Sequence, residues 1–395
     1  MKKDPVVIVG MARTPMGSFQ GSLSSVVGPK LGAVAIQTAL ERSQVSKGDV
    51  SEVIMGCVLP AGQGQAPARQ AALGAGVPID VGATTINKMC GSGMKATMVG
   101  HDSILAGSTD IAVVGGLESM SNAPYILPKA RQGFRMGHAE VKDHMFLDGL
   151  EDAYDKGQLM GVFAENTAEK YQFTRESQDE FAIRSLKRGK KANEDGSFNS
   201  EMAPVMIKKR GEELLVDRDE QPFSANLEKI PNLKPAFRKD GTVTAANSSS
   251  ISDGASALVL MRRSEAEKRA LRPLAAIVAH ATHSQAPEWF TTAPVGAITQ
   301  IFEKTGWSKD EVDLFEINEA FAVVTMAAMR EHGLSADQVN VHGGACAMGH
   351  PVGSSGSRII CTLVGAMHKY HLNKGVAALC IGGGEATAVA IERMN

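Results

Sequence analysis

The sequence has no excess charge of either sign, no long apolar run and no targeting segment. It has 41 Lys and Arg against 43 Asp and Glu, a net charge of −2, so no strong field would hold nucleic acid or an anionic membrane. No apolar run approaches the roughly 18 residues that a membrane-spanning helix needs. Two early lysines do not make a signal peptide, and the final Arg-Met-Asn is not a peroxisomal address. We therefore expect a cytoplasmic protein without nucleic-acid or membrane partners.

Cysteine is scarce as well, and no two cysteines form a CxxC pair. An odd, sparse set argues against a disulfide framework and indicates a reducing compartment. The missing CxxC pairs make a zinc site unexpected, so no metal is predicted. The five cysteines are Cys57, Cys90, Cys346, Cys361 and Cys380.

Apolar residues are plentiful at 43%, with 41 glycines besides, which excludes a disordered or fibrous chain. A length of 395 residues predicts about two or three domains. Short apolar runs alternate with helical patterns, as in α/β proteins. Strands are expected at residues 6–9, 53–58, 111–114, 257–261, 275–279, 314–317, 376–381 and 387–391. Helices are expected at residues 31–42, 67–74, 93–106, 166–171, 177–191, 295–305, 319–332 and 356–368.

The sequence pattern predicts two copies of one βαβαβαββ unit. Ala112-Val-Val-Gly-Gly-Leu-Glu118 closes a strand in the first half, and Leu379-Cys-Ile-Gly-Gly-Gly-Glu385 does so in the second. The next strand follows at once in the second copy, but only near residue 257 in the first. Residues 119–250 are therefore expected to be an insertion, of the kind that usually caps an active site. The predicted domains are residues 1–118 plus 251–270, residues 119–250, and residues 271–395.

The first candidate for chemistry is Cys90, in the segment Asn87-Lys-Met-Cys-Gly-Ser-Gly-Met-Lys95. The chain is expected to turn into a helix here, and Gly91 and Gly93 would permit a strained turn. A thiol at a helix N-terminus feels the positive end of the dipole, so its pKa would fall and its nucleophilic thiolate would be favoured. The alternative is a small buried residue beside a packing glycine.

A second candidate is His350, within the glycine-rich segment that precedes the last expected helix. In the duplication His350 takes the place of Cys90, so both should project from the same end of the two sheets, as base and nucleophile. The alternative is a capping or packing histidine. His342 and Cys346, in the same segment, are interpreted as packing positions.

Cys380 and Asn318 complete the candidate set. Cys380 lies just before three consecutive glycines at a strand end, where a second thiol could act as a general acid or base. Taken alone, it could also be a neutral replacement for Val113, its counterpart in the first half. Asn318 either caps the following helix or holds a water or carbonyl group through its side chain.

Four motifs in this order resemble those of the thiolase family, and the similarity covers essentially the whole chain. Bacterial acetyl-CoA acetyltransferases are the members it looks most like. The resemblance implies a five-layered αβαβα core with an inserted loop domain. It also implies reversible Claisen condensation of two acetyl-CoA to acetoacetyl-CoA and CoA, with coenzyme A as a substrate and no resident cofactor. The motifs are Asn87-Lys-Met-Cys-Gly-Ser-Gly, Asn318-Glu-Ala-Phe-Ala, Gly343-Gly-Ala-Cys-Ala-Met-Gly-His-Pro-Val-Gly and Cys380-Ile-Gly-Gly-Gly.

The resemblance further implies a role for each candidate. Cys90 would carry the acyl group as a thioester, and His350 would activate it. Cys380 would take a proton from the α-carbon of the second acetyl-CoA. His350 and a water held by Asn318 would form the oxyanion site for the enolate, and the N–H groups of Cys90 and Gly382 would form another.

In thiolases the loop domain binds coenzyme A, and part of it, here residues 125–145, joins dimers into tetramers. A homotetramer is therefore expected, with Ser249 near the pantetheine arm and Met160 and Phe321 at the acyl end. Leu159 and Phe290 fall where the family pattern differs, so their contacts to substrate leave the chain-length preference open.

Three other functions remain in competition. The nearest is a degradative 3-ketoacyl-CoA thiolase of broader chain length. A decarboxylating ketoacyl synthase shares the fold but would have a second His or Asn in place of Cys380. A non-enzymatic acyl-CoA-binding protein would not need two spaced thiols and a histidine.

Overall fold

The computed structural model describes residues 4–209 and 211–394. Its centre is a ten-stranded mixed sheet in the order β12-β13-β14-β11-β1-β10-β5-β3-β4, with β2 paired to β10. The strands are β1 (Val6–Arg13), β2 (Gly17–Ser18), β3 (Glu52–Gly56), β4 (Gly82–Ile86), β5 (Ile111–Ser119), β10 (Ser252–Arg262), β11 (Ala275–Ser284), β12 (Leu314–Ile317), β13 (Lys374–Ile381) and β14 (Glu385–Arg393).

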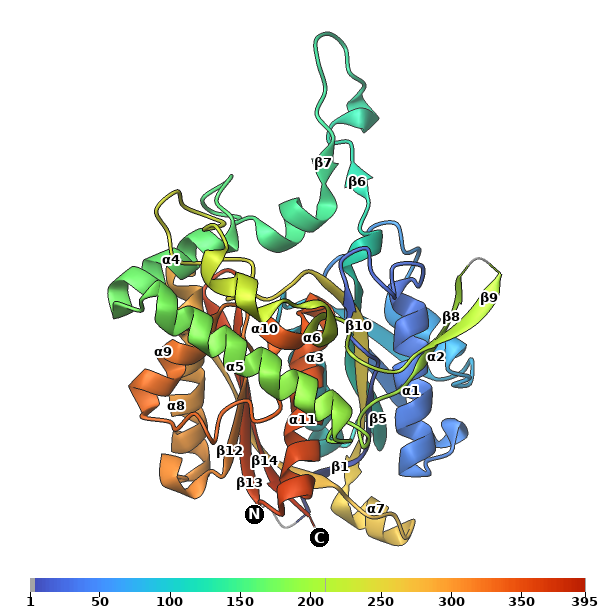
Figure 1. Cartoon of the computed structure of the whole chain (residues 1–395). Helices are drawn as coiled ribbons and strands as arrows, with labels where there is room; N and C mark the ends of the chain where they lie inside the picture. The colour runs from blue at the N-terminus through green and yellow to red at the C-terminus, as the bar shows by residue number, and fades with distance from the viewer. Residues whose placement is uncertain (1–3, 210, 395) are drawn as a thin grey trace.

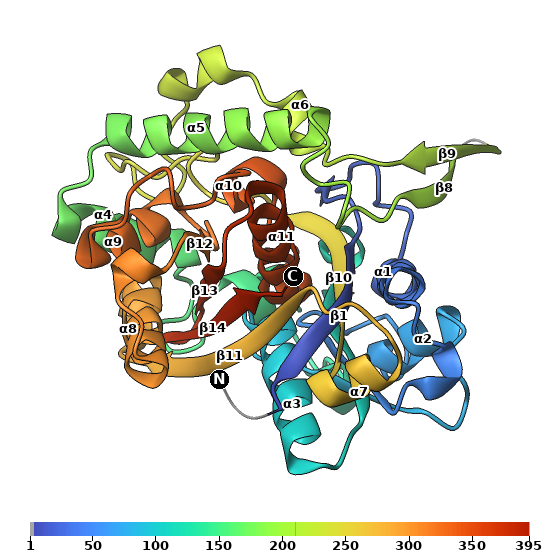
Figure 2. The same ribbon diagram turned by 90° about the horizontal axis from the view of Figure 1, so that it is seen from below.

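The two halves of the sheet and the helices outside and between them form the five layers expected for the fold (Figures 1 and 2). One pair of helices covers the outer face of the first half, a second pair covers that of the second half, and a third pair lies between the halves. The outer helices are α1 (Gly28–Ser43), α2 (Pro67–Gly74), α8 (Ala293–Thr305) and α9 (Ala322–His332), and the central ones are α3 (Ser92–Ala106) and α11 (Val352–Tyr370). Because α11 is enclosed by both half-sheets, it is buried on every side from residue 352 to residue 367.

The two central helices approach the sheet and each other through backbone rather than side chains. A Cβ atom on Gly116 would lie 1.9 Å from the carbonyl oxygen of Gly353, and one on Gly356 would lie 2.3 Å from the amide nitrogen of Met94. No residue larger than glycine fits these places, so the packing fixes how the N-termini of α3 and α11 sit relative to one another.

Within the sheet the two halves meet at a narrow seam, and they differ at one strand. Only the pairs Val7–Ala276 and Ile8–Ala275 connect β1 to β11. The first half has the edge strand β4, which was not predicted, whereas a single bridge between Phe315 and Val339 stands at the corresponding place in the second half. The βαβαβαββ pattern is therefore complete only in the first copy.

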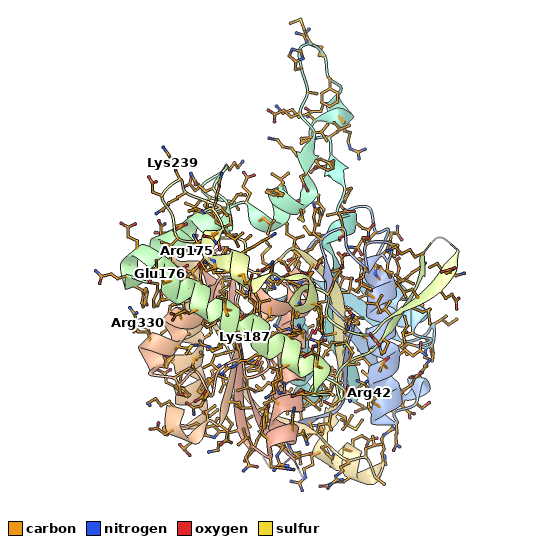
Figure 3. The ribbon with its side chains drawn as sticks, in the orientation of Figure 1. Arg42, Arg175, Glu176, Lys187, Lys239 and Arg330 are labelled. Atoms are coloured by element: carbon orange, nitrogen blue, oxygen red, sulfur yellow. The ribbon has the colours of Figure 1, made fainter. Side chains whose placement is uncertain are left out.

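The segment between β5 and β10 lies across the top and front of the core (Figure 1). Its helix α5 crosses the front, with the charged side chains of Arg175, Glu176 and Lys187 along it (Figure 3). The short hairpin of β6 and β7 projects away from the body, and a second hairpin, β8–β9, was missed by the prediction. The elements are β6 (Tyr125–Ile126), β7 (Lys142–Asp143), α4 (Met160–Tyr171), α5 (Arg175–Glu194), β8 (Val205–Lys209), β9 (Glu212–Val216) and α6 (Gln221–Ser224). The predicted domain boundaries themselves stay a prediction.

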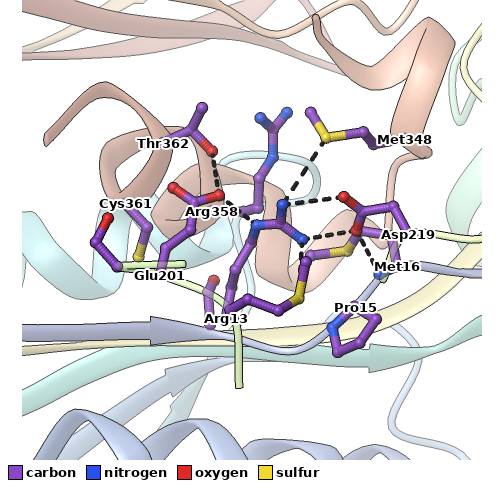
Figure 4. Close-up of polar contacts among 12 residues, drawn as sticks. Arg13, Pro15, Met16, Glu201, Asp219, Met348, Arg358, Cys361 and Thr362 are labelled. Atoms are coloured by element: carbon purple, nitrogen blue, oxygen red, sulfur yellow. Dashed lines mark hydrogen bonds and ion pairs between the residues drawn. The ribbon is translucent and has the colours of Figure 1, made fainter. Parts of the chain in front are cut away.

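A buried ion cluster attaches this segment to the core (Figure 4). Arg13, at the end of β1, is fully buried, and its guanidinium contacts Glu201 at 2.5 Å and Asp219 at 2.6 Å. A buried charge is tolerated only when it is paired and hydrogen-bonded, so Arg13 fixes the return path of the inserted segment against β1.

No helix in the described part of the chain is long and apolar enough to cross a membrane. Cys57 and Cys361 are buried, as predicted for core positions. His342 packs its ring against Phe198 and Tyr370, which agrees with the packing role that the sequence predicted.

Candidate active site

The turn that carries Cys90 is strained, but at a different residue from the one expected. Met89 adopts φ +45°, and its N–H donates to the Asn87 side chain at 2.8 Å. Gly91 has an ordinary φ of −82°. Gly91 and Gly93 instead provide space, because Cβ atoms there would lie 2.4 Å from the Ile381 side chain and 2.6 Å from the Ser357 hydroxyl.

His350 lies two residues before α11, as Cys90 does before α3. Its Nδ1 lies 2.5 Å from the Ser355 hydroxyl, which in turn donates to the Pro351 carbonyl at 3.0 Å. With that hydroxyl proton committed, Nδ1–H donates to Ser355 and Nε2 carries the lone pair. Nε2 is buried and has no hydrogen-bond partner among the described residues.

The electrostatics keep this imidazole neutral. Burial, together with the nearby Arg358 charge, lowers the pKa of His350 to about 3. A buried neutral imidazole with a free Nε2 can accept a proton from an approaching group.

Cys380 lies near the end of β13 and close enough to Cys90 for their charges to interact. Burial raises the pKa of Cys380 well above its usual value, and the charge of Cys90 raises it further. The Gly382 N–H points to Cys90 and works to lower the pKa of that thiol. The two thiols and this N–H group therefore meet at one place.

The expected low pKa of Cys90 is wrong. Burial raises the pKa of Cys90, and the charge of Glu118 adds to this, while the N–H groups of Gly382 and Cys90 itself only partly oppose it. Loss of hydration outweighs the helix dipole, so both thiols are protonated in the free protein.

Asn318 is not a helix cap, although the sequence allowed that role. Helix α9 begins at Ala322 with Phe321 as its N-cap, so the predicted start at residue 319 is wrong. The Asn318 N–H donates to the Ala378 carbonyl on β13 at 3.0 Å. Both polar atoms of its side chain are buried and lack a hydrogen-bond partner among the described residues, which leaves the amide available to a ligand.

An apolar cluster surrounds Cys380. Phe290 and Phe321 belong to it, and Met160 packs against it. The sulfur of Met160 would lie 3.3 Å from a Cβ atom on Gly382, so Met160, at the start of α4, reaches the glycine segment after β13.

Ser249 and Leu159, the two remaining residues predicted to contact the substrate, lie on segments that adjoin this cluster. The Ser249 N–H donates to the Ala320 carbonyl at 2.9 Å, which places Ser249 beside the Asn318–Phe321 loop. Leu159 precedes α4 as its N-cap residue and pairs with Glu151 in a bridge. No described contact joins Leu159 to the thiols.

Two buried glutamates organise the site and were missed by the sequence reasoning. Glu118 accepts the N–H groups of Val58, Leu59 and Gly353 at 2.8–3.1 Å, and thereby ties β3 to the N-terminus of α11. Burial raises its pKa to about 7. A charged residue at the end of an apolar strand was the one signal that could have singled it out.

Glu319 plays a similar role beside Asn318. It accepts from the Ser185 hydroxyl at 2.7 Å, the Asn340 side chain at 2.9 Å and the Cys346 N–H at 3.0 Å. The helical pattern hid this residue, because Glu is also common in the first turn of a helix.

A five-layered α/β fold in which one central helix begins two residues after a thiol and the other two residues after an imidazole is that of a thiolase. Family comparison agrees: the N-terminal thiolase domain matches residues 6–264, and the C-terminal thiolase domain matches residues 271–393. The chain belongs to the thiolase family.

Individual relatives extend over the full length. The acetyl-CoA acetyltransferase of Pseudomonas aeruginosa is 48% identical over 390 residues, covering 98% of this chain and 99% of the relative. The cytosolic acetyl-CoA acetyltransferase of Mus musculus is 47% identical over 393 residues, covering 99% and 98%.

Two solved structures are equally extensive matches. The acetyl-CoA acetyltransferase of Bacillus anthracis has a TM-score of 0.96 at 40% identity and covers 99% of each chain. The Acat5 thiolase of Ascaris suum in complex with coenzyme A has a TM-score of 0.93 at 40% identity, covering 99% of this chain and all of the other.

Proposed function

We propose that the protein is an acetyl-CoA C-acetyltransferase, which joins two acetyl-CoA reversibly to acetoacetyl-CoA and CoA through an acetyl-Cys90 intermediate. The observation that carries this is that the Cys90 and Cys380 thiols interact with one another and that the Gly382 N–H is hydrogen-bonded to Cys90. Full-length relatives named acetyl-CoA acetyltransferase support it.

In the first half-reaction the Cys90 sulfur attacks the thioester carbonyl, and the lone pair of His350 Nε2 takes the thiol proton. The carbonyl oxygen becomes negative and is stabilised by the N–H groups of Cys90 and Gly382. When the carbonyl reforms, the C–S bond to coenzyme A breaks. Cys380 gives its proton to the departing thiolate, so CoA leaves neutral and Cys380 remains as a thiolate.

In the second half-reaction the Cys380 thiolate takes a proton from the α-carbon of the second acetyl-CoA. The enolate oxygen is stabilised by protonated His350 and by a water held on the Asn318 amide. The enolate carbon attacks acetyl-Cys90, the Cys90–acyl bond breaks, and His350 returns its proton to Cys90. A thiol of raised pKa suits this step, because a stronger base removes a weakly acidic proton more readily.

The chemistry uses a thiol pair, an imidazole and an amide, so we propose no catalytic metal and no resident cofactor. Coenzyme A is a substrate and a product. We propose that it binds against the inserted segment, with Ser249 beside the pantetheine arm and Leu159 near the same path. The Ascaris suum structure in complex with coenzyme A supports this class of ligand.

The residues expected around the acyl group favour an enzyme for short acyl chains. They disfavour the alternative, a degradative 3-ketoacyl-CoA thiolase of broader chain length. Phe290 and Phe321 are 2% and 8% exposed and pack with Met160 around Cys380, which restricts the space beside the reacting carbon. CoA-dependent cleavage of acetoacetyl-CoA should be much faster than that of a long-chain 3-ketoacyl-CoA. Comparable rates would favour the degradative enzyme.

Acetyl labelling tests the division of labour between the thiols. With radiolabelled acetyl-CoA, wild type and Cys380→Ser should carry label on Cys90, the variant more slowly because CoA must then leave without the Cys380 proton, and Cys90→Ala should carry none. Only wild type should complete condensation. An unlabelled wild type would indicate a non-enzymatic binding protein, and release of CO2 from a malonyl thioester would indicate a ketoacyl synthase.

We further propose that the enzyme is a cytoplasmic homotetramer. The β6–β7 arm supports the assembly, because Tyr125, Leu127 and Met136 expose 51–86% of their surface on a projecting hairpin. Light scattering of the purified enzyme tests it, and replacing Met136 with Asp should yield dimers.

A further inference from the structure

A cluster of two imidazoles and a carboxylate lies away from the thiols, where the two halves of the fold meet. His101 and Asp102 are on α3, and His280 is on β11 of the second half, paired with Val389 of β14. His101 lies about 14 Å along α3 from its N-terminus, at 1.5 Å per residue. The catalytic proposal does not use these residues.

The three side chains converge on one point. The Asp102 Oδ1 atom lies 2.8 Å from His101 Nδ1 and 2.9 Å from His280 Nε2. The rings are perpendicular, with centroids 5.1 Å apart, and the three ligand atoms lie within 4.8 Å of one another. Ring nitrogens that face one carboxylate oxygen in this way can share a single cation.

Their surroundings fit metal binding. The imidazoles are 5% and 19% exposed on rigid elements, whereas the Asp102 carboxylate is 58% exposed. Nitrogen and carboxylate ligands suit Zn2+ and its neighbours rather than Mg2+ or Ca2+.

We propose that His101, Asp102 and His280 form a binding site for one divalent transition-metal ion, with Zn2+ as the natural occupant. Zinc binds His nitrogen and carboxylate oxygen at about 2.0–2.2 Å, so the present N···O separations need to open by only a few tenths of an ångström. The exposed carboxylate can move that far. Solvent supplies the fourth ligand, and the ion ties α3 to β11 and thereby one half to the other.

This site could not be found by ligand spacing in the sequence. Residues 101 and 102 are adjacent, but the third ligand comes almost 180 residues later. The sequence-based expectation of no metal considered only CxxC pairs, and this site contains no cysteine.

Cobalt titration of the full-length enzyme, first dialysed against a chelator, tests the proposal. Wild type should bind one equivalent of Co2+ with visible d–d bands and no thiolate charge-transfer band, and excess Zn2+ should raise its Tm by ~2 °C or more. Asp102→Asn and His280→Gln should each weaken binding ~10-fold or more. His283→Gln is the matched control, because His283 lies on the same strand and bonds to Gln285 instead.

Three results would overturn the proposal. These are no saturable binding by wild type, wild-type affinity in both Asp102→Asn and His280→Gln, or a thiolate charge-transfer band, which would place the ion on Cys90 or Cys380. Asp102→Asn preserves the size of the side chain, so it answers the question even if the His280 variant folds poorly.

Discussion

The first and second halves place chemically different groups at equivalent positions. Before its central helix the first half has a thiol after a strained Met89, whereas the second has an imidazole after Gly349, at φ +103°. The second thiol, Cys380, lies near the end of β13, whereas Val113, its counterpart in the sequence comparison of the halves, lies near the start of β5, so that part of the sequence alignment is wrong. The duplicated fold supplies two matching positions before the central helices, and the division of base and nucleophile comes from substitutions at those positions.

Replacing the imidazole should have the largest effect. We expect His350→Asn to lower kcat by ~10²–10⁴-fold, the usual contribution of a general base. His342→Asn is the control from the same segment and should keep kcat within a few-fold, because His342 packs against Phe198 and Tyr370. Steady-state kinetics on acetoacetyl-CoA would check this, and equal losses in both variants would contradict the assignment of the base.

The next effect tests how the halves are held together. Gly116→Ala should destabilise the protein by at least about 3 kcal/mol, beyond ordinary overpacking, because its Cβ atom would lie 1.9 Å from the Gly353 carbonyl oxygen. Gly82→Ala, with nothing within 4 Å of its Cβ, should stay within ~0.5 kcal/mol. Urea unfolding compares the two, and a stable Gly116→Ala protein would mean that the helices can separate.

The glutamates that end the two similar sequence segments, Glu118 in β5 and Glu385 in β14, should differ as well. Glu118→Gln should cost about 1–3 kcal/mol, since its amide group would face buried N–H donors, and it should lower kcat by displacing the start of α11. Glu385 pairs with Lys88 at 2.6 Å with 32% exposure, so Glu385→Gln should cost less than ~1 kcal/mol. Equal stability and kcat in the two variants would refute a positioning role for Glu118.

The smallest predicted effect is on how the free energy of unfolding depends on pH. The pKa of His350 is about 3 in the folded protein against 6.5 normally, so between these values only the unfolded chain binds the proton. Stability should therefore fall as pH falls below 6.5, by up to ~1.4 kcal/mol per pH unit. Urea unfolding at pH 5, 6 and 7 should give His350→Asn a shallower slope than wild type, and parallel slopes would contradict the assignment.

Much of this architecture could be predicted, since most strands are apolar runs and the motifs lie beside them. Edge strand β4 was missed because Gly82-Ala-Thr-Thr-Ile is short, mostly small and partly exposed, with no clear alternation. The β8–β9 hairpin was also missed, because its residues near the turn are charged and do not form an apolar run. The start of α9 was predicted wrongly because the Glu319 carboxylate bonds to distant residues instead of joining the first helical turn.

The catalytic residues were easier to find than their electrostatics. Glycine-rich turns beside Cys90, His350 and Cys380 marked the positions, but local sequence does not report burial. The pKa of Cys90 was therefore predicted in the wrong direction, because the packing that desolvates the thiol involves distant segments of the chain.

The buried cluster around Arg13 has a consequence for synthesis on the ribosome. Arg13 emerges among the first residues, but its partners, Glu201 and Asp219, and strand β10, which fills the gap between β1 and β5, come about 190–250 residues later. Until then the growing chain carries an unpaired cation and two open strand edges. The amino-terminal half therefore cannot complete its fold first, and nascent chains stalled before residue 262 should be protease-sensitive and dependent on chaperones.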